Sequence, residues 1–167
     1  YRPQKAGRAK PGFITLINSA PHKGLIVFLS LAKNLPRRKF LVRGRRAVIE
    51  PYLEENKISN VIIDDRTEDI ASVYRKTRIL LVPSLCEDAY ARVITEAMIN
   101  GIPVIANDVG GIRTALQGGG FLADVNLEMK DHPDFTTNPR YHFPLIEQYL
   151  EYIARLDDPK EYALAVK

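Results

Sequence analysis

Short runs of branched apolar residues recur along the chain, with segments of helical periodicity between them. The runs are rich in Ile, Val and Leu and do not alternate strictly with polar residues, which is typical of strands covered on both faces. They predict five strands and a short sixth one, at Phe13–Asn18, Lys39–Arg43, Asn60–Ile63, Ile79–Pro83, Pro103–Ala106 and Phe121–Ala123.

The intervening segments predict amphipathic helices at Leu25–Asn34, Ala47–Lys57, Asp69–Arg75 and Tyr90–Asn100. After an irregular stretch at Asn126–Pro139, a final amphipathic helix is expected at His142–Leu156 and a short one from Pro159. Repeated strand–helix units form parallel sheets through right-handed crossovers. The pattern therefore predicts an α/β fold, a Rossmann-like three-layer α/β/α domain with a mainly parallel sheet of about six strands.

Length and composition suit a single soluble domain. A chain of 167 residues can bury a sizeable core, and 46% hydrophobic with 26% charged residues is ordinary for a globular protein. We expect the domain to occupy residues 11–167, with 1–10 a linker or the cut end of a longer chain. No apolar run is long enough for a bilayer, and the N-terminus lacks a signal-peptide core. The single Cys86 excludes an internal disulfide, which agrees with a cytoplasmic location.

The net charge of +4 conceals two basic clusters. Such clusters can meet phosphates, nucleic acid or an anionic membrane. Charge runs usually form a solvated face, which is the interpretation we favour. No aromatic residues interleave with them as in a nucleic-acid platform, so no nucleic-acid partner is expected, while peripheral contact with the inner face of a membrane stays open. The clusters comprise Arg2, Lys5, Arg8 and Lys10, and then Arg37, Arg38, Lys39, Arg43, Arg45 and Arg46.

Two carboxylates stand out at the fourth strand. Asp88 lies at the start of the helix predicted after that strand, and Glu96 lies eight residues further on, or about 12 Å along a helix. Ligands of wound α/β sheets lie beyond the carboxyl ends of the strands, where the free amides of Tyr90, Ala91 and Arg92 would face an anion. A diphosphate across the helix start could therefore offer sugar hydroxyls to Asp88 and a ribose to Glu96. The simpler alternative is that Glu96 is solvated and Asp88 caps the helix.

The sequence PSLCEDAYARVITEAMINGIPVIANDVGG resembles the Glu-x7-Glu region of the retaining glycosyltransferases of family four, which have the GT-B fold. The pair Lys23-Gly24 upstream and the segment GGGFLADV downstream extend the similarity over most of residues 12–125. The motif residues that this chain keeps are Pro83, Ser84, Leu85, Val93, Glu96, Ala97, Met98, Gly101, Pro103, Val104, Ile105, Ala106, Gly110 and Gly111.

The resemblance implies that the chain is the C-terminal, donor-binding half of a GT-B enzyme of the hexosyltransferase type. Glu96 would bind the ribose of a nucleoside diphosphate sugar, Asp88 the transferred sugar, and Lys23 the diphosphate. The amides of the residues that begin the following helix would also contact phosphate. The resemblance implies no obligatory metal and no cofactor, and no cluster of His, Cys and carboxylates suggests a metal site.

Three positions depart from the family pattern. Asp88 is shorter than the usual Glu, Asn18 stands near the place of an Arg at the end of the first strand, and Thr114 stands where a Glu is common. His22 could partly replace that Arg, although a His beside a Lys is more often a solvated loop residue. Arg66 lies in a loop that could approach the base.

The acceptor-binding N-terminal domain of a GT-B enzyme is absent from this sequence, so the isolated chain is expected to be inactive. The departures above motivate an alternative, a non-catalytic module that binds nucleotide sugars. A nucleotide-sugar epimerase half is a further alternative, for which we find no convincing acid–base set. A dehydrogenase is disfavoured because no G-x-G-x-x-G follows the first strand. The base, the sugar and the acceptor stay open.

Overall fold

A six-stranded, wholly parallel sheet forms the centre of the protein. The computed structural model describes residues 12–65, 69–126 and 143–166. The strands follow the order β3-β2-β1-β4-β5-β6, and every neighbouring pair is parallel. The predicted Rossmann-like α/β fold with a parallel sheet is confirmed. The strands are β1 (Phe13–Ile17), β2 (Phe40–Arg43), β3 (Val61–Asp64), β4 (Thr77–Val82), β5 (Val104–Asn107) and β6 (Phe121–Ala123).

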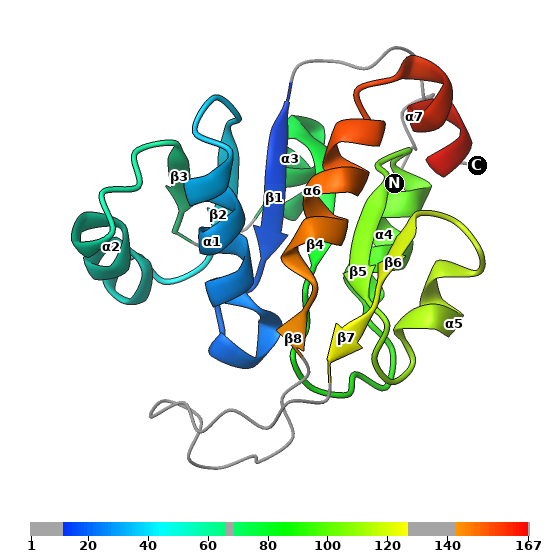
Figure 1. The fold of residues 1–167 in the computed structure, drawn as a ribbon, viewed down its shortest axis with the longest axis horizontal. Helices are drawn as coiled ribbons and strands as arrows, with labels where there is room; N and C mark the ends of the chain where they lie inside the picture. The colour runs from blue at the N-terminus through cyan, green and yellow to red at the C-terminus, as the bar shows by residue number, and fades with distance from the viewer. Residues whose placement is uncertain (1–11, 66–68, 127–142, 167) are drawn as a thin grey trace.

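Helices cover both faces of this sheet, as Figure 1 shows for α1 and α6 on the near side and α3 and α4 behind. We call the two sides the α1 face and the α4 face. The described helices are a 3₁₀ turn (Pro21–Lys23), α1 (Leu25–Asn34), α2 (Arg46–Glu55), α3 (Ile70–Lys76), α4 (Arg92–Ile99), α5 (Ile112–Leu116), α6 (Ile146–Arg155) and α7 (Pro159–Ala165).

Alternation along each strand divides the core between the two faces. Ile14 and Leu16 of β1 belong to the cluster on the α1 face, whereas Ile17 packs against the cluster on the α4 face. On β2, Val42 lies on the α1 face, so its successor Arg43 projects from the α4 face. The parallel register agrees, because it pairs Ile17 with Arg43.

Two helix starts differ most from the predicted ones, by two residues at α4 and by four at α6. Helix α4 begins at Arg92, so Tyr90 lies in the preceding loop and Ala91 is the N-cap. The 12 Å estimate from Asp88 to Glu96 therefore fails, because Asp88 precedes the helix. Helix α6, expected at His142–Leu156, begins at Ile146, because Phe143–Pro144 (β8) pairs antiparallel with Val125–Asn126 (β7).

The other predicted element boundaries lie within two residues of the observed ones. That difference is the usual uncertainty of helix and strand ends. The expected linker at 1–10 and nearly all of the expected irregular stretch at 126–139 lie outside the described residues.

A buried hydrogen-bond network connects α6 to the loop that follows β4. Tyr149 donates its hydroxyl to Oδ1 of Asn107 at 2.8 Å, and Nδ2 of Asn107 donates to the carbonyl of Ser84 at 2.8 Å. All three residues are buried, and burial raises the pKa of Tyr149 well above its usual value, so the phenol remains a neutral donor. The network therefore fixes the start of the loop that carries Asp88.

Replacing Tyr149 by Phe should lower the free energy of unfolding by about 1–2 kcal/mol, because the buried Oδ1 of Asn107 loses its donor. Urea unfolding followed by circular dichroism measures the change. Tyr52→Phe is the matched control, since the Tyr52 hydroxyl makes no hydrogen bond within the described residues. Equal losses in the two variants would contradict the assigned role of the network.

Candidate functional site

A cavity of about 550 Å³ lies at the carboxyl ends of β1, β2 and β4. The chain runs from β1 outward to β3 and then crosses back to β4, so β1 and β4 are neighbours at the topological switch point of the sheet. Ligands of open α/β sheets bind at this position, and the volume falls in the range of small-molecule sites. Its polar lining residues are Asn18, Ser19, Lys23, Arg43, Ser84, Asp88, Tyr90 and Arg92.

The loop after β1 brings Lys23 over the cavity. Asn18 adopts a left-handed conformation with a φ of 81°, and its Oδ1 accepts a hydrogen bond from the amide of Ala20 at 3.0 Å. Gly24 also has a positive φ, 83°, and a Cβ at this position would lie 1.9 Å from the carbonyl oxygen of Pro83. The loops that follow β1 and β4 are therefore in direct contact behind Lys23.

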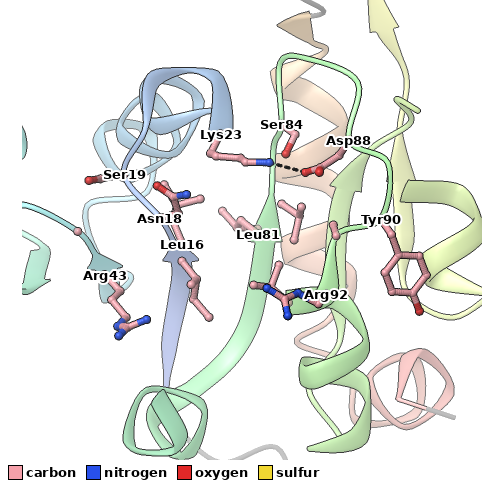
Figure 2. Close-up of a pocket in the computed structure, with 15 residues that line it drawn as sticks. Leu16, Asn18, Ser19, Lys23, Arg43, Leu81, Ser84, Asp88, Tyr90 and Arg92 are labelled. Carbon is pink, nitrogen blue, oxygen red and sulfur yellow. Dashed lines mark hydrogen bonds and ion pairs between the residues drawn. The ribbon is translucent and has the colours of Figure 1, made fainter. Parts of the chain in front are cut away.

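Lys23 and Asp88 form an ion pair across the cavity (Figure 2). Nζ of Lys23 lies 2.5 Å from Oδ2 of Asp88, and the two side chains are 26% and 21% exposed. An ammonium group has three donors, so Lys23 can hold Asp88 and still donate to a second oxygen. The structure thus brings together the residues that the sequence associates with the diphosphate and the transferred sugar.

The glycine pair after β5 supports the loop that carries Asp88. The amide of Gly111 donates to the carbonyl of Asp88 at 2.7 Å. Gly110 has a φ of 53°, and a Cβ on Gly111, whose φ is −80°, would lie 2.1 Å from the carbonyl oxygen of Ala89. The pair therefore does more than turn the chain, because its missing side chains make room for the Asp88 loop.

The first residues of α4 provide the expected amide groups. Tyr90, Ala91 and Arg92 all line the cavity, and no backbone carbonyl among the described residues accepts a bond from their amides outside the helix. A helix N-terminus with free amides attracts anions. Figure 2 shows the ring of Tyr90 turned away from the Lys23–Asp88 pair, and its hydroxyl lies 2.8 Å from Oγ1 of Thr95.

Glu96 lies beside the cavity and is not among the residues that line it. It is exposed on α4, one turn beyond Arg92, and its Oε2 accepts a 2.6 Å hydrogen bond from the hydroxyl of Tyr74 on α3. Tyr74 is 4% exposed. The buried phenol thus orients one oxygen of an exposed carboxylate, and the other oxygen keeps its capacity to accept hydrogen bonds.

The weaker candidates differ in position. Asn18 lines the cavity, whereas His22 is exposed, does not line it, and uses its carbonyl to accept from the amide of Leu85 at 2.9 Å. Arg66 lies outside the described residues. Cys86 follows Leu85 in the same loop, and burial raises the pKa of its thiol.

Arg43 is the charged cavity residue that the sequence interpretation missed, because it falls in a basic run assigned to a solvated face. It lines the cavity from the end of β2, followed by Gly44. The available signal was its place one residue after the buried Val42, which puts it on the opposite face of the strand at its carboxyl end.

Two further properties concern only the described residues. No three His, Cys, Asp or Glu side chains gather there in an arrangement that would hold a metal ion. Within the same ranges, no helix is long and apolar enough to cross a membrane.

Comparisons with known proteins place this chain in a family. A family model described as "Glycosyl transferases group 1" matches residues 10–135. A D-inositol 3-phosphate glycosyltransferase of Nocardia farcinica is 42% identical over 52 residues, which are 31% of this chain and 11% of that protein.

Solved structures share the fold at low identity. A glycosyltransferase from Rickettsia africae matches with a TM-score of 0.70 and 17% identity over 94% of this chain, which spans 41% of that structure. Anabaena HepE, solved in complex with UDP and glucose, matches with a TM-score of 0.69 and 20% identity over 95% of this chain and 42% of its own. The chain thus spans less than half the length of these relatives.

Replacing Gly111 by Ala should displace the Asp88 loop, because the new Cβ overlaps the carbonyl of Ala89. We expect a loss of about 1–3 kcal/mol in the free energy of unfolding. Cys86 should also react faster with iodoacetamide at pH 7.5, because losing burial lowers its raised pKa and increases the thiolate fraction.

Gly118→Ala is the control, since its φ of 84° strains an alanine but no atom lies within 4 Å of a Cβ there. This variant should lose stability without changing the reactivity of Cys86. An unchanged alkylation rate in Gly111→Ala would show that the glycine does not support the loop.

Proposed function

This chain belongs to the group 1 glycosyl transferases, and we propose that it is the nucleotide-sugar-binding domain of a retaining enzyme of family four. The observation that carries the proposal is the cavity at the switch point, where Lys23, Asp88 and the start of α4 lie together. Structures of Anabaena HepE in complex with UDP and glucose and in complex with UDP-glucose share this fold, which supports a nucleoside diphosphate sugar as the ligand. We propose a hexosyl group as the group transferred.

In this proposal the diphosphate lies between Lys23 and the first amides of α4. The leaving diphosphate gains negative charge as the glycosidic bond breaks, and fixed donors already aimed at it stabilise that charge. Asp88 accepts hydrogen bonds from hydroxyls of the transferred sugar. The Lys23–Asp88 pair, 2.5 Å between charged atoms, keeps the sugar-binding carboxylate next to the diphosphate-binding ammonium. Donor binding then needs no metal ion.

Glu96 binds the ribose hydroxyls in the same proposal. Its carboxylate is exposed on α4 next to the cavity-lining Arg92 and Val93, and Tyr74 fixes its orientation through Oε2. Carboxylate oxygens accept from vicinal hydroxyls, so a fixed carboxylate discriminates a ribose from a deoxyribose.

The acceptor site belongs to another part of a longer protein in this proposal. The chain spans 41% of the Rickettsia africae structure and 42% of the HepE structure. The isolated chain should therefore bind the donor without transferring sugar. Turnover by this chain alone would contradict that part of the proposal.

A non-catalytic nucleotide-sugar-binding module is the second candidate. It is favoured by Asp88, because this carboxylate is short and already engaged by Lys23. Asp88→Glu in the intact parent protein separates the two: activity with either residue establishes transfer, and inactivity of both proteins with binding retained supports the module.

Calorimetric titration of the chain with UDP, GDP, ADP, dTDP and CDP tests donor binding directly. We expect one of them to bind best, without loss in EDTA, and Glu96→Gln to weaken it roughly tenfold, about 1.4 kcal/mol, through the lost ribose contact. Glu87→Gln is the control, since Glu87 is exposed and does not line the cavity. A folded chain that binds none of the five would refute the proposal.

Tyr74→Phe should lower the affinity for the preferred ribonucleotide about threefold to tenfold, because Glu96 loses the donor that orients it. Binding of the 2′,3′-dideoxy analogue should not change, because that analogue has no hydroxyls for Glu96. Tyr90→Phe, which loses a hydroxyl directed away from the site, is the control. Equal weakening of both nucleotides would mean that Tyr74 has only a structural role.

A further inference from the structure

We propose that Arg43 binds a phosphate of the nucleoside diphosphate and so is a specificity residue of the cavity. The inference rests on the proposed function and deepens it, because it assigns a ligand contact to β2, a strand from which the proposed function takes no ligand-binding residue.

The charges that line the cavity come from Lys23, Arg43, Arg92 and Asp88. Lys23 lies 2.5 Å from Asp88, so part of its charge is already compensated. The cavity-lining residues directly after β1, Asn18 and Ser19, are neutral. A nucleoside diphosphate carries more than one negative charge, so a cation beside the shared ammonium improves charge complementarity, and the cavity offers Arg43 on one side and Arg92 on the other.

The end of β2 lies against the loop after β1. A Cβ on Gly44 would lie 2.1 Å from Oγ of Ser19, so the absence of a side chain at Gly44 permits the contact. Register pairing places Arg43 next to Ile17, the last residue of β1. Arg43 is therefore the basic residue of β2 that lies beside the end of β1, where the cavity-lining Asn18 and Ser19 are neutral.

Arg43 projects from the α4 face, which is also the face that carries Glu96 and Tyr74. Figure 2 shows the Arg43 side chain on the β2 side of the cavity and that of Arg92 on the α4 side, with Leu16 and Leu81 between them. A nucleotide with its ribose at Glu96 and its phosphates at the start of α4 would cross the space between these two arginines. The arrangement presents phosphate oxygens to donors from two walls.

Asp64 is the neighbouring carboxylate to consider. It is the register partner of Arg43 on β3, so both side chains project from the same face. A guanidinium has five N–H donors in a planar fork and can serve a carboxylate on one edge and a phosphate on another. If Arg43 serves only its protein neighbours, its removal will change stability and leave phosphate recognition intact, which an experiment can separate.

The test compares ligands that differ only in phosphate. The full 167-residue chain is titrated with its preferred nucleoside diphosphate, the matching monophosphate and the free nucleoside, each up to millimolar concentration. Arg43→Gln should lower the affinity for the diphosphate at least tenfold and change the affinity for the nucleoside less than twofold. The diphosphate affinity of Arg43→Lys should lie between those of the wild type and Arg43→Gln, because lysine keeps the charge but loses the bidentate geometry.

Arg45→Gln is the matched control, an exposed arginine two residues away that does not line the cavity, and it should bind like wild type. The dependence of diphosphate affinity on salt should also become shallower in Arg43→Gln, since one charge contact is lost. Circular dichroism and thermal unfolding establish that each variant is folded, and Arg43→Lys decides the question if Arg43→Gln does not fold.

Two outcomes overturn the inference while the proposed function stands. In the first, Arg43→Gln binds the diphosphate as tightly as wild type. In the second, Arg43→Gln lowers the affinities for the diphosphate and for the nucleoside by equal factors. Asp64→Asn would have the same effect if the two residues only support the strand ends. A folded wild-type chain that binds no nucleoside diphosphate would overturn the inference and the proposed function together.

Discussion

The contact between Gly24 and Pro83 is the constraint on which the site depends. Only a glycine fits, because its φ is 83° and a Cβ would lie 1.9 Å from the Pro83 carbonyl oxygen. The contact joins the loops that follow β1 and β4, and the bond from the Leu85 amide to the His22 carbonyl continues it. Lys23 then reaches Asp88 across 65 residues of sequence. Two neighbouring strands thus become the two walls of one cavity.

The sequence predicted this scaffold well because it depends on local patterns. Branched apolar runs specify buried parallel strands, and the six observed strands follow them. The start of α4 at Arg92 was not predictable in the same way. The backbone from Asp88 to Ala91 is held out of the helix by a distant partner, the Gly111 amide, which donates to the Asp88 carbonyl. Gly111 also packs so closely against Ala89 that an added Cβ would lie 2.1 Å from the Ala89 carbonyl oxygen. Nothing local to the helix encodes that contact.

Arg43 shows that a run of basic residues in the sequence does not reveal which of them lines the cavity. In sequence it is one member of a basic run that reads as a solvated face. In space the run divides, because strand alternation sends Arg43 into the cavity while Arg45 and Arg46 remain exposed after the strand ends. The separation depends on register with β1 and on the Gly44–Ser19 contact, and both are tertiary properties.

The Lys23–Asp88 pair has a consequence for ligand choice under the proposed function. A bare diphosphate at Lys23 would lie beside a carboxylate that repels it, because Asp88 is within 2.5 Å of the same ammonium. A diphosphate that carries a sugar brings hydroxyl donors to that carboxylate and converts the repulsion into hydrogen bonds. The same pair therefore favours the intact donor over its nucleoside diphosphate product. Such a preference helps to release the product once the sugar has been transferred.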